Sequence, residues 1–284
     1  MKVVKDISEA RAEIKKARTA GKIVGFIPTM GALHAGHISL VEAAKKQCDF
    51  VAVSIFVNPA QFGPDEDFKK YPRVFKSDEK LLQKEKVDLI FYPSASQMYP
   101  DNFSTYVEEA LLSKPLCGLS RPGHFRGVCT IVAKLFNIIT PDIAYFGQKD
   151  YQQAMIIKRM AEDLNFSTIV KICPIVRESD GLAMSSRNVY LNPAERKDAL
   201  VLAEALKLAE KSIKEGQTDA VKIIEEMYGF ILSKKTARID YVEIVDAKTL
   251  QEVEEIKQKV LIALAVYIGK TRLIDNVVVH AKSN

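Results

Sequence analysis

The alternation of short apolar runs with helical patterns over residues 1–176 constrains the fold more than any other feature of this sequence. The apolar runs are rich in branched or aromatic residues and cover Ile23–Ile27, Phe50–Val57, Asp88–Tyr92, Asp142–Phe146 and Thr168–Val176. Helical patterns lie between them, at Ser39–Lys46, Phe75–Glu85, Val128–Ile139 and Tyr151–Leu164, and an Asp6/Glu9 capping box predicts a further helix that ends at Gly21. Strands that alternate with helices predict a parallel sheet covered on both faces.

The pattern changes after Pro193, where helices are grouped before strands. Two long helices are predicted at Pro193–Lys214 and Thr218–Ser233, followed by strands at Ile239–Val245, Val260–Ile268 and Thr271–Val279. Such grouping is typical of a separate α+β unit. We therefore predict an α/β fold, with a Rossmann-like doubly wound parallel sheet in residues 1–176 and a smaller α+β C-terminal domain in residues 177–284.

Two of the four histidines lie three residues apart, where the first predicted strand runs through a Pro/Gly turn into a helix. The first N–H groups of a helix have no intrahelical partner and the helix dipole is positive there, so this end favours an anion. His34 and His37 project from neighbouring points of that turn, and Gly31 and Gly36 allow a ligand to approach the backbone. The alternative is an ordinary turn that carries two surface histidines.

Polar segments follow other predicted strands. Asn58 and Gln61 follow the second strand, and amide side chains there can both donate to and accept from a small polar substrate. Lys149 and Gln153 follow the strand Asp142–Phe146, and Lys149 offers a point charge for a phosphate. In the segment 184–188, two hydroxyls and Arg187 suit the oxygens of a polyphosphate. Simple turns, a solvated lysine and a helix-capping serine cluster are the alternatives for these segments.

Composition limits the function classes. Hydrophobic residues make up 48% of the 284 residues and charged residues 27%, which is ordinary for a folded soluble protein. The net charge of +5 comes from 41 basic and 36 acidic residues interspersed along the chain, so it gives no indication of a nucleic-acid partner. The N-terminus is too evenly charged for a secretory signal, and the longest apolar stretch, Val260 to Gly269, is about half the length that crosses a bilayer. We expect a cytoplasmic enzyme with no membrane partner.

Four segments occur in order along the chain, at Pro28–His37, Phe56–Phe62, Phe146–Gln153 and Met184–Asn188. Together they resemble the pantoate–β-alanine ligase family of the H-x-G-H nucleotidyltransferase superfamily. The match runs from Gly21 to about Asn192, and the part after Pro193 matches mainly in length and pattern. Four motifs in this order and at this spacing are highly specific.

The resemblance implies ATP-dependent condensation of pantoate with β-alanine to give pantothenate, AMP and pyrophosphate through a pantoyl adenylate. Its catalytic residues would be His37, the proton donor, together with His34, Lys149 and Arg187. Gln61 and Gln153 would bind pantoate, and Gln61 would also lie near β-alanine. The ATP site would comprise Met30, Gly31, Ala32, Leu33, His34, Ala35, Gly36, His37, Gly147, Gln148, Lys149, Asp150, Val176, Met184, Ser185, Ser186 and Arg187.

The resemblance also implies Mg²⁺ bound with the nucleotide, a homodimer formed through the N-terminal domain, and a C-terminal domain that acts as a lid. No protein ligand of the metal is identified. The family commonly has Glu where this chain has Gln148, and we expect the activity to be retained. The segment 121–127, with Arg121, His124 and Arg126, is also similar to the family, and its basic residues could close over the site.

Two other functions remain open from the residues. One is another H-x-G-H nucleotidyltransferase that acts on a phosphorylated acceptor, which would need basic residues in place of Gln61 and Gln153. The other is a protein that binds a nucleotide or a nucleic acid without catalysis, for which the positive charge is the only support. The chain shows no basic stripe with interleaved aromatic residues of the kind that binds single-stranded nucleic acid.

Overall fold

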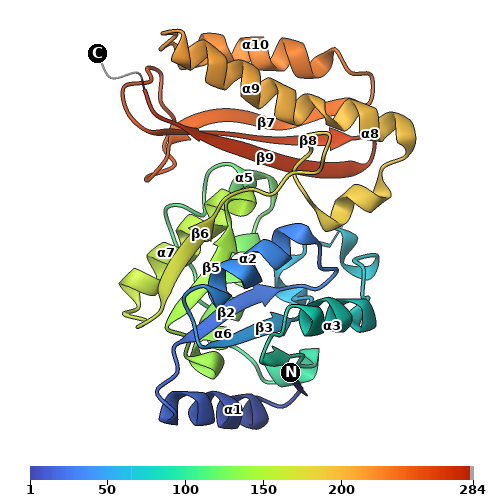
Figure 1. Ribbon diagram of the computed structural model, residues 1–284. Helices are drawn as coiled ribbons and strands as arrows, with labels where there is room; N and C mark the ends of the chain where they lie inside the picture. The colour runs from blue at the N-terminus through green and yellow to red at the C-terminus, as the bar shows by residue number, and fades with distance from the viewer. Residues whose placement is uncertain (65, 282–284) are drawn as a thin grey trace. The chain divides into compact units, whose positions relative to one another are not determined.

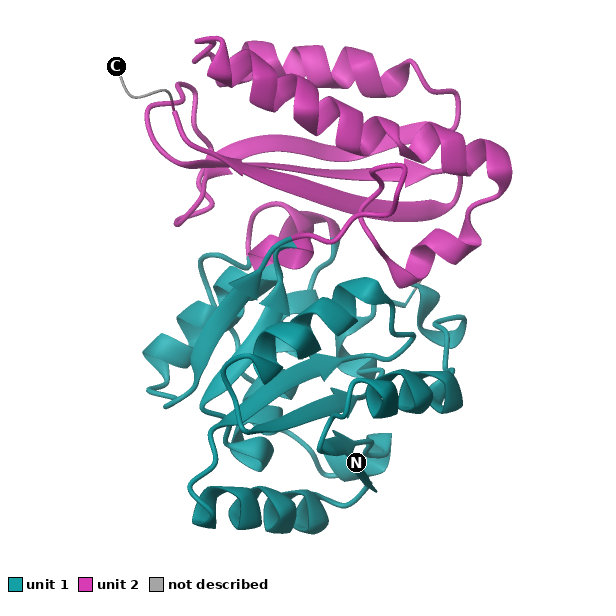
Figure 2. Ribbon diagram, viewed as in Figure 1, with its two compact units in different colours: residues 1–113, 121–148, 153–174 teal, residues 114–120, 149–152, 175–284 magenta. Residues whose placement is uncertain are grey.

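The computed structural model describes residues 1–64 and 66–281, which form two compact units (Figure 2). The first unit comprises residues 1–113, 121–148 and 153–174, and the second comprises residues 114–120, 149–152 and 175–284. The division after the N-terminal sheet therefore falls between Pro174 and Ile175, close to the position 176/177 expected from the sequence. Two short internal segments also belong to the second unit.

Hydrogen bonds join the two internal segments to each other and to the rest of the second unit. The carboxamide of Gln152 accepts from the backbone N–H of Cys117 at 3.1 Å and donates to the carbonyl of Pro115 at 2.6 Å. The hydroxyl of Tyr151 donates to the carbonyl of Ala247 at 2.9 Å. Sequence periodicity carries no signal for such contacts, because they join residues that are distant along the chain.

The first unit is built on a parallel six-stranded sheet (Figure 1). The strand order is β1-β4-β3-β2-β5-β6, and every pair in it is parallel. The chain builds outward from β2 on one side and then crosses to β5 on the other, so the order reverses between β2 and β5. The strands are β1 (Lys2–Val4), β2 (Val24–Thr29), β3 (Phe50–Ile55), β4 (Leu89–Phe91), β5 (Ile143–Gly147) and β6 (Ile169–Cys173).

Helices follow the strands, as the parallel arrangement requires. Helix α2 contacts β2, β3 and β5, whereas α1 and α6 pack against each other and both contact β2. A buried cluster that includes Ile27, Val41, Val53 and Leu82 joins α2 and α3 to the sheet. The helices whose residues lie in this unit are α1 (Ile7–Thr19), α2 (Ala35–Lys45), α3 (Phe75–Lys84), α4 (Ala95–Met98), α6 (His124–Ile139) and most of α7 (Tyr151–Asp163), with the 3-10 turns η1 (Pro59–Gln61) and η2 (Asp67–Lys69).

The second unit is an antiparallel sheet covered by helices. Its strand order is β7-β8-β9, and the helices pack their apolar positions on β8 and its neighbours to form one buried cluster. The elements are β7 (Ala237–Asp246), β8 (Val260–Ile268), β9 (Thr271–Val279), α5 (Cys117–Ser120), α8 (Pro193–Ala199), α9 (Val201–Lys214) and α10 (Ala220–Leu232), with the 3-10 turn η4 (Ser186–Tyr190).

The predicted fold class, a doubly wound parallel sheet with a small α+β unit, is confirmed. Several element boundaries were wrong. The strand β1 was missed because three residues carry no periodicity, and α2 and α6 begin earlier than predicted, at Ala35 and His124. The helix predicted at Pro193–Lys214 is two helices that meet at Leu200, where neither Pro nor Gly marks the break.

The predicted capping box of α1 is also wrong. Asp6 is the N-cap residue of α1, but its side chain makes no capping hydrogen bond. Its carboxylate instead accepts from the carboxamide of Gln97, which belongs to α4. The Asp6 carboxylate therefore forms a tertiary hydrogen bond with Gln97 in place of the predicted local capping bond.

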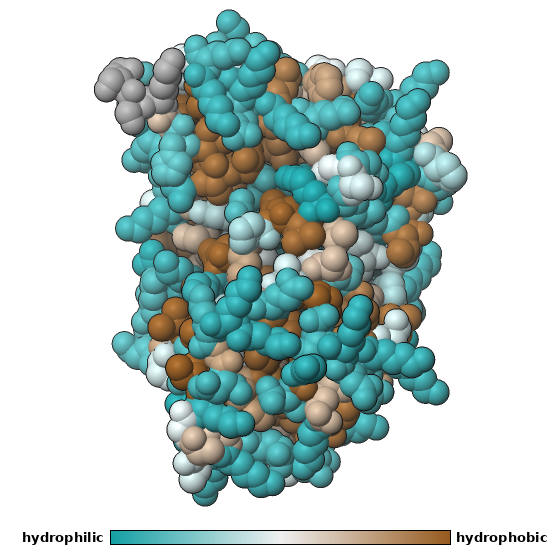
Figure 3. Space-filling model, viewed as in Figure 1, coloured by the Kyte–Doolittle hydropathy of each residue, from teal (hydrophilic) through white to brown (hydrophobic). Residues whose placement is uncertain are grey.

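Charged residues cover much of the surface, as their dispersal along the sequence suggests. Figure 3 shows hydrophilic side chains over all parts of one face, with apolar side chains in separate patches between them. In the described part of the chain, no helix has the length and apolar character needed to cross a membrane. The longest apolar stretch of the sequence is the buried strand β8.

Gly127 allows α6 to pack closely against η1. A Cβ at this position would overlap the backbone carbonyl oxygen of Ala60, and backbone atoms cannot move aside as a flexible side chain can. We predict that Gly127→Ala lowers the free energy of unfolding by about 1–3 kcal/mol or more, as overpacking does. Denaturant titration measures this change.

The matched control is Gly229→Ala. Gly229 also lies inside a helix, α10, but a Cβ there meets nothing within 4 Å. Because alanine is the better helix former, this substitution should raise stability by about 0.5–1 kcal/mol. Equal effects of the two substitutions would contradict the close approach of α6 to η1.

Candidate active site

The turn between β2 and α2 has an unusual backbone. Gly31 and Ala32 both adopt left-handed conformations, with φ of +83° and +49°. A Cβ on Gly31 would lie 3.0 Å from both a carboxylate oxygen of Asp78 and a methyl group of Ile55. A left-handed alanine costs free energy, so surrounding contacts must hold the turn in place.

Asp78 supplies those contacts. It lies on α3 and is 1% exposed, and its two carboxylate oxygens accept the backbone N–H groups of Ala32 at 2.9 Å and Leu33 at 2.8 Å. Burial raises the pKa of the Asp78 carboxyl above its usual value, and the two backbone hydrogen bonds act against that rise. A buried carboxylate from a neighbouring helix thus fixes the strained turn.

The two histidines cap the start of α2. The His34 ring accepts the N–H of Gly36 through Nδ1 at 3.1 Å, and the His37 ring accepts the N–H of His34 through Nδ1 at 3.3 Å. A ring nitrogen that accepts a hydrogen bond carries no proton, so in each neutral ring Nε2 carries it. The ring centroids are 4.2 Å apart. Capping therefore sets both tautomers and makes each Nε2 a hydrogen-bond donor.

This arrangement suits an anion. Two Nε2–H donors stand beside the N-terminus of an 11-residue helix, whose dipole also favours negative charge. The parallel sheet places this turn at the carboxyl end of β2, where the strand order reverses toward β5. Ligands of open α/β sheets bind at such reversal points. The geometry supports binding of a phosphate-containing ligand.

Gln61 follows β3 at the same edge of the sheet and is 9% exposed. Its carboxamide accepts from Asn58 Nδ2 at 3.1 Å and donates to the sulfur of Met30 at 3.0 Å. Asn58 is held in turn by the carbonyl of Gly127 and by the hydroxyl of Tyr99, which donates at 2.8 Å. Burial raises the pKa of Tyr99 far above its ordinary value, so the hydroxyl keeps its proton and remains a donor.

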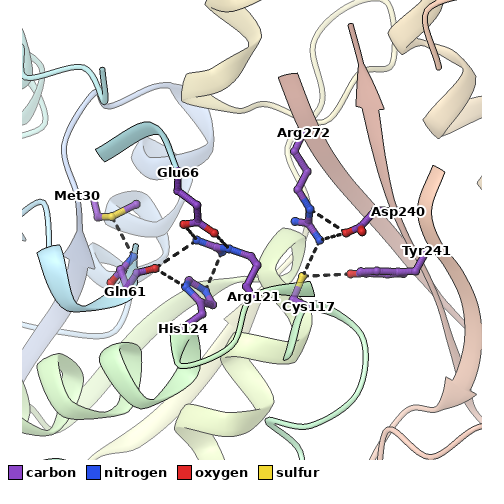
Figure 4. A network of polar contacts seen from close by, with 9 residues as sticks. All are labelled: Met30, Gln61, Glu66, Cys117, Arg121, His124, Asp240, Tyr241 and Arg272. Carbon is purple, nitrogen blue, oxygen red and sulfur yellow. Dashed lines mark hydrogen bonds and ion pairs between the residues drawn. The ribbon is translucent and has the colours of Figure 1, made fainter. Parts of the chain in front are cut away.

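The side chains of the segment 121–127 contact other residues of the first unit (Figure 4). Arg121 forms a two-pronged ion pair with Glu66 at 2.6 Å, and His124 and Arg121 both contact the backbone carbonyl of Gln61. Arg126 lies over the ring of Tyr106, with 4.7 Å between the guanidinium carbon and the ring centroid. These cations are therefore held by partners in the same unit.

The segment after β5 is divided between the units. Gly147 and Gln148 belong to the first unit, and Lys149 and Asp150 to the second. The ammonium of Lys149 lies 4.0 Å from a carboxylate oxygen of Asp150, which is at the limit of an ion pair. Gln153 lies half-buried on the first turn of α7.

The remaining predicted residues lie in a braced loop of the second unit. The N–H of Met184 donates to the carbonyl of Val176 at 3.0 Å. The Ser185 hydroxyl accepts the N–H of Arg187 at 3.2 Å and so caps η4, which is the capping role weighed for this serine cluster. A hydroxyl has one hydrogen to donate as well, so the cap leaves Ser185 able to serve as a donor.

Ion pairs brace this loop within the second unit. Arg177 forms two hydrogen bonds with Asp275, at 2.6 and 3.1 Å, and Arg196 contacts both Glu178 and Asp180. The hydrogen bonds of Arg196 lower the pKa values of both carboxyls. These charged side chains position the segment from Val176 to Arg187.

The structure thus brings His34 together with His37, Met30 with Gln61, Val176 with Met184, and Ser185 with Arg187. Sequence reasoning missed the residues that position them, Asp78 above all. A signal was present: Asp78 lies three residues after Phe75 and four before Leu82, so it stands on the apolar face of its helix. A charged residue on that face indicates a buried partner.

Comparisons with known proteins match one family over nearly the whole chain. The sequence profile of the family described as Pantoate-beta-alanine ligase matches residues 2–278. Pantothenate synthetase of Thermotoga neapolitana is 57% identical over 278 residues, which is 98% of this chain and 99% of the relative.

Solved structures of the same family are also similar to this chain. The crystal structure of pantothenate synthetase from Thermus thermophilus has a TM-score of 0.93 at 43% identity and covers 98% of this chain and 99% of its own. Pantoate-beta-alanine ligase from Francisella tularensis, complexed with beta-gamma ATP and β-alanine, has a TM-score of 0.81 at 36% identity and covers 98% of this chain and 97% of its own.

We predict that Asp78→Asn loosens the turn between β2 and α2. The amide keeps one acceptor and turns N–H groups toward a backbone N–H, so the free energy of unfolding should fall by about 1–3 kcal/mol. The N–H groups of Ala32 and Leu33 should exchange with solvent faster, which amide hydrogen exchange measures. Asp101→Asn, at an exposed aspartate, is the control. Unchanged exchange at both amides would contradict the role of Asp78.

Proposed function

Because the chain belongs to the pantoate–β-alanine ligase family, it is an enzyme that joins pantoate to β-alanine through an amide bond, and we propose that it does so through a pantoyl adenylate. ATP is the substrate that activates the acid, which the nucleotide complex of the Francisella tularensis ligase supports. The observation that carries the proposed route is the pair of histidine Nε2–H donors at the N-terminus of α2.

The proposed reaction has two steps. A carboxylate oxygen of pantoate attacks the α-phosphorus of ATP, and the bond to pyrophosphate breaks with its electron pair on the leaving group. The amine of β-alanine then attacks the acyl carbon of the adenylate, loses a proton and displaces AMP. Activation is needed because a carboxylate is a poor acyl donor to an amine, and both steps gain chiefly from the positioning of the reactants.

The capped histidines fit the first step. Negative charge grows on the phosphate oxygens in the transition state, and donors that are fixed in place before the reaction need little reorganisation. His37 is proposed as the proton donor and His34 as its assistant at the same phosphates. Lys149 and Arg187 are proposed to neutralise phosphate charge, Lys149 as a point charge and Arg187 by its planar fork.

The other proposed ATP contacts follow from the family resemblance. In the first unit, the Nε2–H groups of His34 and His37 and the positive end of the α2 dipole support the assignment of this turn to phosphate. The residues proposed to contact ATP are Met30, Gly31, Ala32, Leu33, His34, Ala35, Gly36, His37, Gly147 and Gln148 of the first unit and Lys149, Asp150, Val176, Met184, Ser185, Ser186 and Arg187 of the second.

Pantoate is proposed to bind Gln61 and Gln153, with Gln61 also near β-alanine. A buried neutral carboxamide suits a small hydroxy acid, since it can donate to the carboxylate and accept from a hydroxyl. A nucleotidyltransferase with a phosphorylated acceptor would need basic residues at these positions, and this chain has neutral amides there. Family membership also favours the ligase.

Mg²⁺ is proposed to bind with ATP, where it would neutralise charge on the phosphates. Among residues 1–64 and 66–281, no group of three His, Cys, Asp or Glu side chains is arranged to hold a metal ion. Mg²⁺ usually keeps several waters and binds through substrate phosphates, so the donor set fits a metal carried by the nucleotide. A homodimer formed through the N-terminal domain, a lid role for the C-terminal domain and a cytoplasmic location are further proposals from the family.

An incubation tests the two-step route. With ATP, Mg²⁺ and pantoate alone, the enzyme should release pyrophosphate in an amount close to the enzyme concentration and retain the adenylate. Addition of β-alanine should give AMP and the amide product in equal amounts, measured by mass spectrometry. The adenylate route would be wrong if [¹⁸O]carboxylate pantoate gave unlabelled AMP.

We predict that His37→Asn lowers the rate of adenylate formation about 100-fold, as the loss of one donor to a developing oxyanion does. Asparagine keeps an acceptor near the position of Nδ1 for the N–H of His34 but has no group at Nε2. The variant therefore keeps the capping hydrogen bond and loses only the proposed donor to phosphate. Affinity for pantoate should change little, because the lost contact strengthens only in the transition state. Single-turnover kinetics and equilibrium binding measure the two effects, and His280→Asn, at an exposed histidine, is the control.

A further inference from the structure

The backbone carbonyl of Gln61 is held by the side chains of Arg121 and His124, which lie about 60 residues away along the chain. His124 Nδ1 lies 2.7 Å from this carbonyl oxygen, and a terminal nitrogen of Arg121 lies 3.3 Å from it. His124 is the first residue of α6 and is 9% exposed. Contacts of this kind orient the turn that carries the Gln61 side chain.

The contacts of His124 define its tautomer. A carbonyl oxygen only accepts, so Nδ1 must carry the proton that it donates to Gln61. The other ring nitrogen, Nε2, lies 3.0 Å from Arg121, and a guanidinium only donates, so Nε2 is the acceptor. The neutral ring therefore accepts a hydrogen bond from the guanidinium of Arg121 and donates one to the carbonyl of Gln61.

Glu66 completes the arrangement. Its two carboxylate oxygens each accept from Arg121 at 2.6 Å, one from Nε and one from a terminal nitrogen. Burial works to raise the pKa of Glu66, but the hydrogen bonds and charge of Arg121 prevail and hold it below its usual value. A bidentate pair restricts the guanidinium more than a single contact does.

The Gln61 side chain is oriented separately. Asn58 and Met30 hold its carboxamide, whereas Arg121 and His124 hold its backbone carbonyl. Glu66 in turn holds Arg121. Figure 4 shows Arg121 and His124 meeting the backbone carbonyl of Gln61, with Glu66 paired to Arg121. Gly127, one turn along α6 from His124, allows the helix to approach this turn.

We propose that Glu66, Arg121 and His124 form a positioning clamp that sets the Gln61 carboxamide for pantoate. The clamp residues touch no substrate and act through Gln61. This inference rests on the proposed role of Gln61 in pantoate binding. The clamp consequently determines affinity for pantoate and leaves affinity for ATP unchanged.

The test compares three substitutions at His124. His124→Phe removes both ring contacts and should raise the KM for pantoate about tenfold, as the loss of hydrogen bonds within a buried network does. His124→Asn keeps a donor near the position of Nδ1 and should restore most of the affinity. His124→Gln has its amide near Nε2 instead and should not. The KM for ATP should stay within about twofold throughout, since the phosphate donors are untouched.

A double-variant cycle shows whether His124 acts through Gln61. Gln61→Ala alone should raise the KM for pantoate, and adding His124→Phe should raise it by less than about twofold more, because coupled residues are not additive. Glu66→Gln, which preserves the shape of the clamp, serves as a second variant if His124→Phe does not fold. It should raise the KM for pantoate in the same direction but less, and His280→Phe is the matched control at an exposed histidine.

Each failure has a distinct signature. Additive effects in the double variant, or equal losses of pantoate and ATP affinity, would overturn the clamp and leave Gln61 as a pantoate residue. An unchanged KM for pantoate in Gln61→Ala would overturn the assignment of Gln61 and the clamp with it. Failure of the wild-type enzyme to form the amide product would instead contradict the proposed reaction.

Discussion

The parallel pairing of β2 with β3 on one side and β5 on the other decides where the polar segments of the first unit lie. Parallel strands bring their carboxyl ends to one edge, so the histidine turn, the Asn58–Gln61 turn and Gly147 all leave the sheet there. The strand order reverses between β2 and β5, at this same edge. No local property of the segments produces this arrangement.

Buried polar side chains from the helices then set two of these segments, the histidine turn and the Asn58–Gln61 turn. Asp78 accepts two backbone N–H groups from the strained turn, and His124 donates to the backbone carbonyl of Gln61. Unsatisfied polar groups in such places are costly, so each network is stable only in one arrangement. This restriction gives the proposed catalytic and substrate-binding groups one geometry before any ligand binds.

Much of the site was predictable from the order of residues along the chain. The His34 and His37 pair could be recognised because a strand, a turn and a helix N-terminus follow each other locally. Gln61 could be recognised because it follows a strand. Asp78 and Glu66 were not recognised, since their partners lie 46 and 55 residues away along the chain. The serine cluster could be interpreted as a cap or as a ligand site, and the structure shows the cap for Ser185.

The sequence by itself determined the fold class, the family and the identity of the proposed reacting groups, because these depend on periodicity and on ordered motifs within short segments. Only the tertiary structure decided the tautomer of His124, the partner of the left-handed turn and the contacts that hold the backbone of Gln61. These depend on hydrogen bonds between α3, α6 and the loops after β2 and β3. Their donors and acceptors are distant in the chain, and folding alone brings them within bonding distance.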